Sequence, residues 1–372
     1  MQVSRLLSGE SDIWVGRRTR LKRHLVTAME GFFPVVVRTG PHHLAAIYRT
    51  GAPHVGITGT LAVSTSEDGG KSWSDSVQVQ PRWDDTRNPA LGVNAQGELV
   101  AAFWKARLHC YQVDSAQKEP QFVWSGEEQP SWRTIPSLHY CKSADGGRTW
   151  GEVSTYMSET ISCGSPYGRI ISAPDGTLLM AFYGRAREPL PNFRDTSILL
   201  RSTDGGATWG DESVVAHEYN ETSYAFLPGG ELLAAARSES GHVATLHSSD
   251  GGRTWSQPVQ VTRDGEHPAD LTVLQSGRVL LTFGRRIRPM GCGALLSEDG
   301  GHTWNRDREV LLAGDGIENG DLGLSLHRAT GRWPDRDPSL LRIRLRDVQG
   351  VFRLGPGILP GHTLPRRGHP LK

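Results

Sequence analysis

Short apolar segments recur in pairs along the chain, and a polar turn separates the two members of each pair. Each segment is shorter than a typical helix, and a short apolar run bounded by turn residues is typical of a buried β-strand. The pairs are Pro34–Arg38 with Leu44–Tyr48, Ala90–Val93 with Glu98–Trp104, Arg169–Ser172 with Thr177–Tyr183, Ser223–Leu227 with Glu231–Arg237, and Leu271–Leu274 with Arg278–Phe283. In four pairs a glycine stands just before the second segment, at Gly97, Gly176, Gly230 and Gly277. The pattern predicts five β-hairpins with tight turns.

A polar motif, Ser-x-Asp-x-Gly-x-x-Trp, follows each of these hairpins. It occurs five times and ends at Trp73, Trp150, Trp209, Trp255 and Trp304. Its chemistry suits a tight turn, because Asp accepts hydrogen bonds from backbone amides, Gly adopts positive φ and Trp packs its apolar ring against the fold. We therefore expect the motif's Asp and Trp residues to be structural rather than catalytic.

One hairpin and one motif turn with its flanking strands make a unit of four antiparallel strands, which is one blade of a β-propeller. The units recur roughly every 50 residues, so the span from about residue 30 to about residue 330 holds six blades. The sequence therefore predicts an all-β, six-bladed β-propeller of four-stranded antiparallel blades.

The last part of the chain departs from this pattern. Residues 326–372 are rich in proline and basic residues, and from residue 328 onward ten Lys or Arg face three Asp. Because proline cannot donate to a central strand, we expect an incomplete or irregular sixth blade and a loose tail from about Gly355. The predicted division is an N-terminal segment at 1–29, the propeller at 30–325 and an irregular C-terminal segment at 326–372.

Composition supports a turn-rich fold and excludes several partners. The chain holds 44 Gly and 22 Pro among 372 residues, and its net charge is +1, which argues against nucleic acid as a partner. No apolar run reaches the ~20 residues of a membrane-spanning helix. The first 25 residues lack the apolar core of a secretory signal, so we expect a cytoplasmic protein, or a secreted one if the N-terminus is truncated. The four Cys show no metal-type spacing, no cofactor motif is present, and the oligomeric state stays open.

The fivefold motif on a predicted six-bladed propeller resembles the sialidase (neuraminidase) superfamily over about residues 30–325. This resemblance implies a glycoside hydrolase of exo-α-sialidase type that acts on a terminal acidic sugar without a metal or other cofactor. In sialidases a Glu assists the nucleophile and an Arg sixteen residues later binds the substrate carboxylate, and Glu221 and Arg237 match that spacing. A guanidinium group grips a carboxylate bidentately. The alternative is a structural salt bridge across one hairpin.

Three positions depart from the family. The first blade opens with Phe32-Phe33-Pro34, where sialidases have Arg-Ile-Pro, so one carboxylate-binding Arg is missing. Residues 49–65 contain no Asp to act as the acid but hold Arg49 and His54, and no Tyr follows Tyr224 to act as the nucleophile. A covalent mechanism through a last-blade Tyr is therefore not supported. Two hypotheses remain, a hydrolase with a non-standard site and a lapsed propeller that binds acidic glycans.

Further site candidates come from strand ends that would face the propeller axis. Candidate catalytic residues are Glu221 as base or orienter and His54, Asp85 or Asp270 as proton donor. Candidate ligands of the acidic sugar are Arg49, Arg87, Tyr167, Arg185, Arg237 and Arg286. Several of these Arg residues end the second strand of a blade, and a ring of cations around one axis would favour an anionic ligand. The alternative is that each Arg reaches solvent at its own blade edge.

Overall fold

The computed structural model describes residues 11–15, 19–24, 26–27, 31–51, 59–80, 85–106, 111–112, 121–122, 138–187, 195–313, 325–327 and 349–351. Within these ranges the chain consists of strands and turns, with one short 3-10 helix, η2, at Arg306–Arg308. None of the described segments forms a helix long and apolar enough to cross a membrane. The all-β class predicted from the sequence is confirmed.

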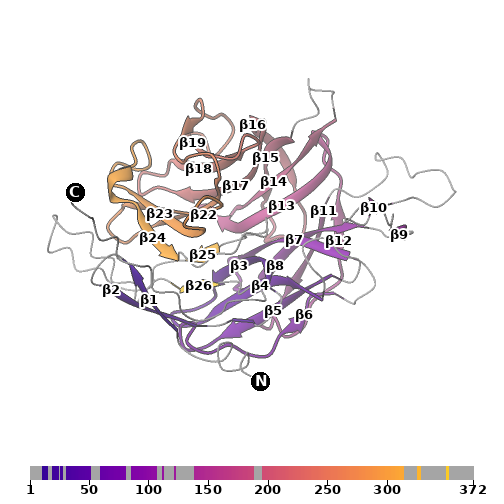
Figure 1. The fold of residues 1–372 in the computed structure, drawn as a ribbon. Coiled ribbons are helices and arrows are strands. Elements are labelled where there is room, and N and C mark those ends of the chain that lie inside the picture. Colours follow the sequence, from indigo (N-terminus) through magenta and orange to yellow (C-terminus); the bar gives the residue numbers. More distant parts are fainter. Residues whose placement is uncertain are drawn as a thin grey trace, which may run out of the picture.

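Four-stranded antiparallel units follow one another in chain order (Figure 1). The first contains β3 (Phe32–Arg38), β4 (Leu44–Thr50), β5 (Thr60–Ser66) and β6 (Val77–Gln78). The second contains β7 (Asp85–Val93), β8 (Leu99–Ala106), β11 (Leu138–Ser143) and β12 (Ser154–Tyr156). The third contains β13 (Ile161–Ser172), β14 (Leu178–Ala186), β15 (Asp195–Ser202) and β16 (Gly210–His217). The fourth contains β17 (Tyr219–Phe226), β18 (Leu232–Ser238), β19 (Val243–Ser248) and β20 (Val259–Gln260). The fifth contains β21 (Glu266–Val273), β22 (Val279–Arg285), β23 (Gly291–Ser297) and β24 (Val310–Ala313).

All five predicted hairpins are confirmed as the first two strands of these units. The first strands also meet across the units, since β3 contacts β7, β13 contacts β17 and β17 contacts β21. Between β7 and β13 the contact is a short parallel pairing, which joins the second and third units into one eight-stranded sheet.

A cavity of about 360 Å³ shows that the first strands converge. Every first strand contributes to its wall, through Val36, Val93, Ile170, Ala225 and Leu271. The arrangement is that of propeller blades whose inner strands surround a common axis, with the apolar core lying between neighbouring blades. One core cluster, for example, combines Val100 and Tyr140 of the second blade with Leu178 and Phe182 of the third.

The repeated motif forms the same hydrogen-bonded turn in each blade. In the third motif, Asp204 Oδ1 accepts bonds from the Thr208 amide at 2.9 Å and the Ser202 hydroxyl at 2.8 Å, and Ser202 Oγ accepts from the Gly206 amide at 2.8 Å. Gly206 has φ of 86°, and a Cβ there would lie 2.8 Å from Val100 of the preceding blade. Glycine is required because the turn is left-handed and packs directly against the neighbouring blade.

In the part of the chain that the structure describes, six further short strands lie outside the five blades. They are β1 (Ser11–Val15), β2 (Thr19–Arg23), β9 (Tyr111–Gln112), β10 (Gln121–Phe122), β25 (Ser325–His327) and β26 (Gln349–Val351). The β1–β2 hairpin contacts β24, and β25, paired with β26, contacts both β3 and β21. The expected loose tail from Gly355 lies outside the described residues.

Candidate active site

Glu221 and Arg237 form the centre of the candidate site. Glu221 lies near the start of β17 and Arg237 near the end of β18, and the hairpin register brings both to the same end of the fourth blade. Arg237 Nη1 donates to Glu221 Oε2 at 2.6 Å. The Glu221 side chain is 11% exposed and that of Arg237 is 27% exposed. The sixteen-residue spacing therefore does bring the two charges into contact, and the Arg237 side chain remains partly exposed.

Two tyrosines of the third blade lie in the electrostatic field of this pair. Burial, reinforced by the nearby Glu221 carboxylate, raises the pKa of Tyr167 well above 10, and the same two causes raise the pKa of Tyr183. The Tyr167 hydroxyl donates to the Ala269 carbonyl at 3.4 Å, and the Tyr183 hydroxyl accepts from Asn88 Nδ2 at 3.2 Å. Both phenols therefore stay protonated near neutral pH and act as hydrogen-bonding groups.

Asp270 is held by an arginine from another blade. Arg169 Nη2 of β13 donates to Asp270 Oδ1 of β21 at 3.1 Å, across the axis between the third and fifth blades. Burial raises the pKa of the Asp270 carboxyl, and the Arg169 charge opposes that shift. The predicted proton donor thus has a raised pKa, as an acid requires, but it is also engaged in an ion pair.

His267 lies beside the same charges and is neutral. Burial and the charges of Arg237 and Arg286 lower the pKa of the imidazole to about 3. The ring is therefore uncharged at any pH at which the fold is expected to work, so it cannot donate a proton as an imidazolium. It offers a neutral polar group close to the Glu221–Arg237 pair.

Asp195 contributes a further carboxyl from the start of β15. Burial raises its pKa, while the hydrogen bond from Asn220 Nδ2 at 3.3 Å and the charges of Arg185 and Arg237 lower it. Asn220 also accepts a bond from the Glu221 backbone amide at 2.8 Å, so one side chain connects the Asp195 carboxyl group to the backbone of Glu221. The site therefore combines acidic, phenolic and cationic groups from the third, fourth and fifth blades.

The other predicted arginines do not form one ring of equivalent cations. Arg49 is fully buried and donates to the Thr86 carbonyl at 2.7 Å between the first two blades. Arg87 packs over the ring of Trp104 at 5.4 Å, and Arg185 is exposed. The Arg286 amide donates to Gly265 at 2.7 Å, and its charge acts on His267. Arg237 and Arg286 thus share one neighbourhood through His267, whereas Arg49 and Arg87 have structural contacts between or within blades.

The structure does not describe the side chains of two predicted proton donors. His54 lies outside the described residues, and Asp85 is described only as the first residue of β7, without its side chain. Tyr183, Asp195 and Arg169 are the residues of the candidate site that sequence reasoning missed, whereas His267 lies in a stretch that it placed at the axis. Asp195 could have been found from its position opposite Arg185 in the pairing of β14 with β15, but this pairing is known only once β15 has been located. No local signal links Arg169 to Asp270, which stands 101 residues later.

The comparisons with known proteins agree with this fold. The family described as "BNR repeat-like domain" matches residues 111–319. A curated relative named sialidase, from Bacteroides fragilis (strain YCH46), is 23% identical over 273 residues, which cover 68% of this chain and 49% of the relative. The chain thus spans about half the length of that relative.

Solved structures show the same architecture. A protein of unknown function from Dyadobacter fermentans DSM 18053 superposes with a TM-score of 0.63 at 21% identity, covering 79% of this chain and 86% of that one. The Hadza microbial sialidase Hz136 superposes with a TM-score of 0.57 at 21% identity, covering 74% of this chain and 58% of that one. At these identities the likeness establishes the sialidase-type propeller fold and nothing finer.

Proposed function

Since the chain belongs to the BNR repeat-like domain family of the sialidase superfamily, we propose that it is an exo-α-sialidase-type glycoside hydrolase that acts on a terminal sialic-acid-like sugar of glycans. The observation that carries the proposal is the Glu221–Arg237 ion pair, surrounded by Tyr167, Asp270 and His267 at one end of the inner strands. An acidic sugar needs a cation that is reachable from solvent, and Arg237 keeps part of its side chain exposed beside a buried carboxylate.

In the proposed mechanism Arg237 binds the sugar carboxylate through the donors that Glu221 does not use, and Arg286 adds a second positive charge. Glu221 acts as the base or orienting group. Asp270 is the proposed acid because its raised pKa favours the protonated form, with Asp85 and His54 as the alternative donors. Tyr183 donates a hydrogen bond to a sugar hydroxyl, and the Tyr167 hydroxyl, whose proton is donated to the Ala269 carbonyl, accepts one from the sugar.

A second function is favoured by two specific sequence features. The first blade has Phe32-Phe33-Pro34 in place of the family's Arg-Ile-Pro, and no Tyr follows Tyr224. A propeller without the family nucleophile and with fewer carboxylate-binding arginines is expected to bind acidic glycans without cleaving them. The two candidates share the ligand and differ only in turnover.

We also infer that the propeller has six blades, with the domain extending over about residues 30–325. The contacts of β25 with β3 and β21 support this inference, because a strand between the first and fifth blades occupies the inner position of a sixth. The β1–β2 hairpin against β24 is then a neighbour of that sixth blade on its outer side.

The test of function combines turnover and binding. A fluorogenic sialoside measures hydrolysis, and a titration with free sialic acid measures affinity. Arg237→Ala should weaken binding of sialic acid at least about tenfold, or ~1.4 kcal/mol, while binding of its methyl ester changes far less, because only the carboxylate engages the guanidinium.

The controls separate the candidates. Arg148→Ala removes an exposed arginine of the second motif turn, at the opposite end of the blades, and should leave affinity for sialic acid almost unchanged. Binding without hydrolysis would establish the glycan-binding alternative. Equal loss of affinity for the acid and the ester in Arg237→Ala would contradict both candidates.

A further inference from the structure

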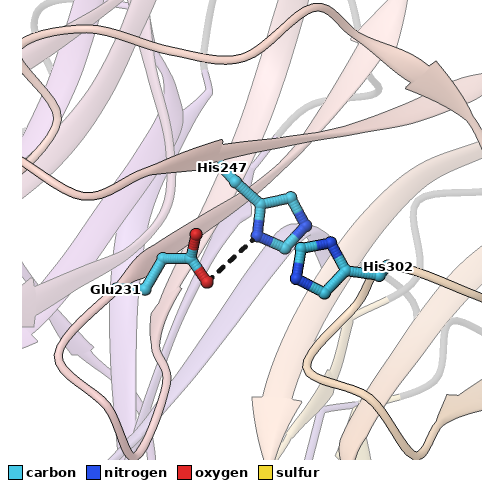
Figure 2. Close-up of side chains that lie close together, drawn as sticks. All are labelled: Glu231, His247 and His302. Carbon is cyan, nitrogen blue, oxygen red and sulfur yellow. Dashed lines mark ion pairs between the residues drawn. The ribbon is translucent and has the colours of Figure 1, made fainter.

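A cluster of two histidines and one glutamate lies at the end of the blades opposite Glu221 and Arg237. Glu231 belongs to the turn between β17 and β18, His247 to β19 and His302 to the motif turn of the fifth blade (Figure 2). Their ligand-type atoms all lie within 4.8 Å of one another. Three segments from two blades therefore present two imidazoles and one carboxylate to one place.

His247 is the less exposed of the two histidines, and its hydrogen bonding is incomplete. Its side chain is 14% exposed, and Nδ1 lies 3.4 Å from Glu231 Oε2. Among the described residues, neither Nδ1 nor Nε2 has a hydrogen-bond partner. Buried polar atoms are nearly always satisfied by a partner, by water or by a bound ion, so this ring calls for an additional ligand.

His302 stacks on His247 from the neighbouring blade. The two ring centroids lie 4.1 Å apart with an interplanar angle of 4°, and His302 is exposed. The stack brings the imidazole of the fifth blade directly against the imidazole of the fourth blade.

The second blade has an ion pair at the position that the cluster occupies in the fourth blade. Glu98 and Lys142 occupy the positions of Glu231 and His247, because each Glu directly precedes the second strand of its blade and each partner directly precedes the motif Ser. Lys142 Nζ and Glu98 Oε2 form an ordinary ion pair at 2.9 Å. The motif turn that packs there carries Ala207 where the fifth turn carries His302. An ion pair alone thus satisfies the fold at this position, and the two histidines are not needed there for structure.

We propose that Glu231, His247 and His302 bind a divalent transition-metal ion of the Zn²⁺ class, which links the fourth blade to the fifth. Two imidazole nitrogens and one carboxylate oxygen form a donor set that suits Zn²⁺, with water as the fourth ligand. Bonds of about 2.0–2.2 Å place such ligand atoms roughly 3.3 Å apart, so the exposed His302 ring must turn out of its stack toward Glu231. The cluster lies at the opposite end of the blades from Glu221 and Arg237, so the bound ion would stabilise the contact between two blades.

The test uses the full chain after removal of metal with a chelator, titrated with Zn²⁺ alone. Bound zinc per chain, affinity and melting temperature are measured for the wild type, His302→Ala, His247→Gln and the control Lys142→Ala. We expect one zinc per wild-type chain and a rise in melting temperature on its addition. Both histidine variants should bind zinc at least tenfold more weakly and lose the rise, while Lys142→Ala should behave as the wild type.

His302→Ala keeps the test valid if His247→Gln fails to fold, because the third motif already carries alanine at the same position of its turn. Replacement of zinc by Co²⁺ gives a second readout, since a four-coordinate nitrogen and oxygen site has a visible absorption that His302→Ala should abolish. The proposal is overturned if the wild type binds no zinc, or if His302→Ala retains one zinc with unchanged affinity.

Discussion

Several buried charges among the described residues are paired, and these pairs join different strands or blades. Glu221 meets Arg237 across one hairpin, Asp270 meets Arg169 across the axis, and Arg285 lies 3.0 Å from the fully buried Glu266. An ionised group inside a fold is tolerated only when a partner and hydrogen bonds replace its water. The pairing therefore fixes how the blades face one another around the site.

The Arg169–Asp270 pair gives a prediction about pH. Asp270 has a folded-state pKa above its unfolded value, so its ionised form opposes folding, and this cost disappears as the pH falls below the unfolded value. Arg169→Met removes the partner of a nearly buried carboxylate and should destabilise the protein by about 3–5 kcal/mol near pH 7. The loss should shrink as the pH falls toward 4, because Asp270 then takes up a proton.

Urea unfolding at pH 7 and at pH 4 measures this effect. The double variant Arg169→Met/Asp270→Asn is the control, since it leaves no unpaired charge and should recover much of the stability at pH 7. A loss in Arg169→Met that is the same at both pH values would mean that the arginine acts through packing alone.

Single residues also show where sequence reasoning reached its limit. The sixteen-residue spacing was sufficient to predict the contact of Glu221 with Arg237, because two antiparallel strands joined by a short turn bring both ends of one hairpin together. Arg169 and Asp270 come from different blades, and their contact depends on how the blades close around the axis. The surroundings of the predicted arginines also depend on how the blades pack, since Arg49 is fully buried in an inter-blade contact whereas Arg185, at the end of β14, is exposed.

At the scale of elements, the motif turn is the best-predicted part of the molecule. Its hydrogen bonds are local, so eight residues specify them. Asp299 shows the effect: burial tends to raise its pKa, but bonds from Thr303 and Ser297 outweigh it and lower the pKa to about 2. What the sequence did not predict is the depth of each Trp, because burial depends on the neighbouring blade. Trp209 is 6% exposed, whereas the other four motif Trp residues are half-buried.

Trp209→Ala should therefore be the most damaging of the five motif substitutions. The indole packs in the core cluster between the second and third blades, and its removal leaves a cavity that should cost about 3–5 kcal/mol of the free energy of unfolding. The matched control is Trp73→Ala, at the same position of the first motif, which should cost less because that ring is only half-buried. Chemical denaturation of the two variants measures the difference. Equal losses would show that the hydrogen bond of the Trp73 indole to the Gly70 carbonyl matters as much as burial.

At the scale of the whole molecule, the fold was predictable because one unit repeats. Five hairpins and five motifs define five blades without any long-range information, and each predicted inner strand overlaps an observed one, although the observed strands begin earlier, as β13 does at Ile161 rather than Arg169. Closure of the ring is different, because it joins segments from the two ends of the chain and leaves no local pattern. The contacts of β1 with β24 and of β25 with β3 and β21 are of this kind.

Ring closure leads to the last prediction. A chain that ends at Leu324 lacks β25 and β26, so the inner edges of β3 and β21 lose the strand that lies between them. Because these two strands belong to the first and fifth blades, the opening should lower the melting temperature and broaden the unfolding transition as the blades lose cooperativity. A chain that begins at Gly31 lacks the β1–β2 hairpin, which contacts the outer strand β24, and also Val26, which packs against the first blade; it keeps every inner strand and should lose less stability. Calorimetry of both truncated chains and the full chain measures their melting temperatures, which we expect to be lowest for the chain that ends at Leu324. An unchanged melting temperature in the chain ending at Leu324 would show that five blades close without a sixth.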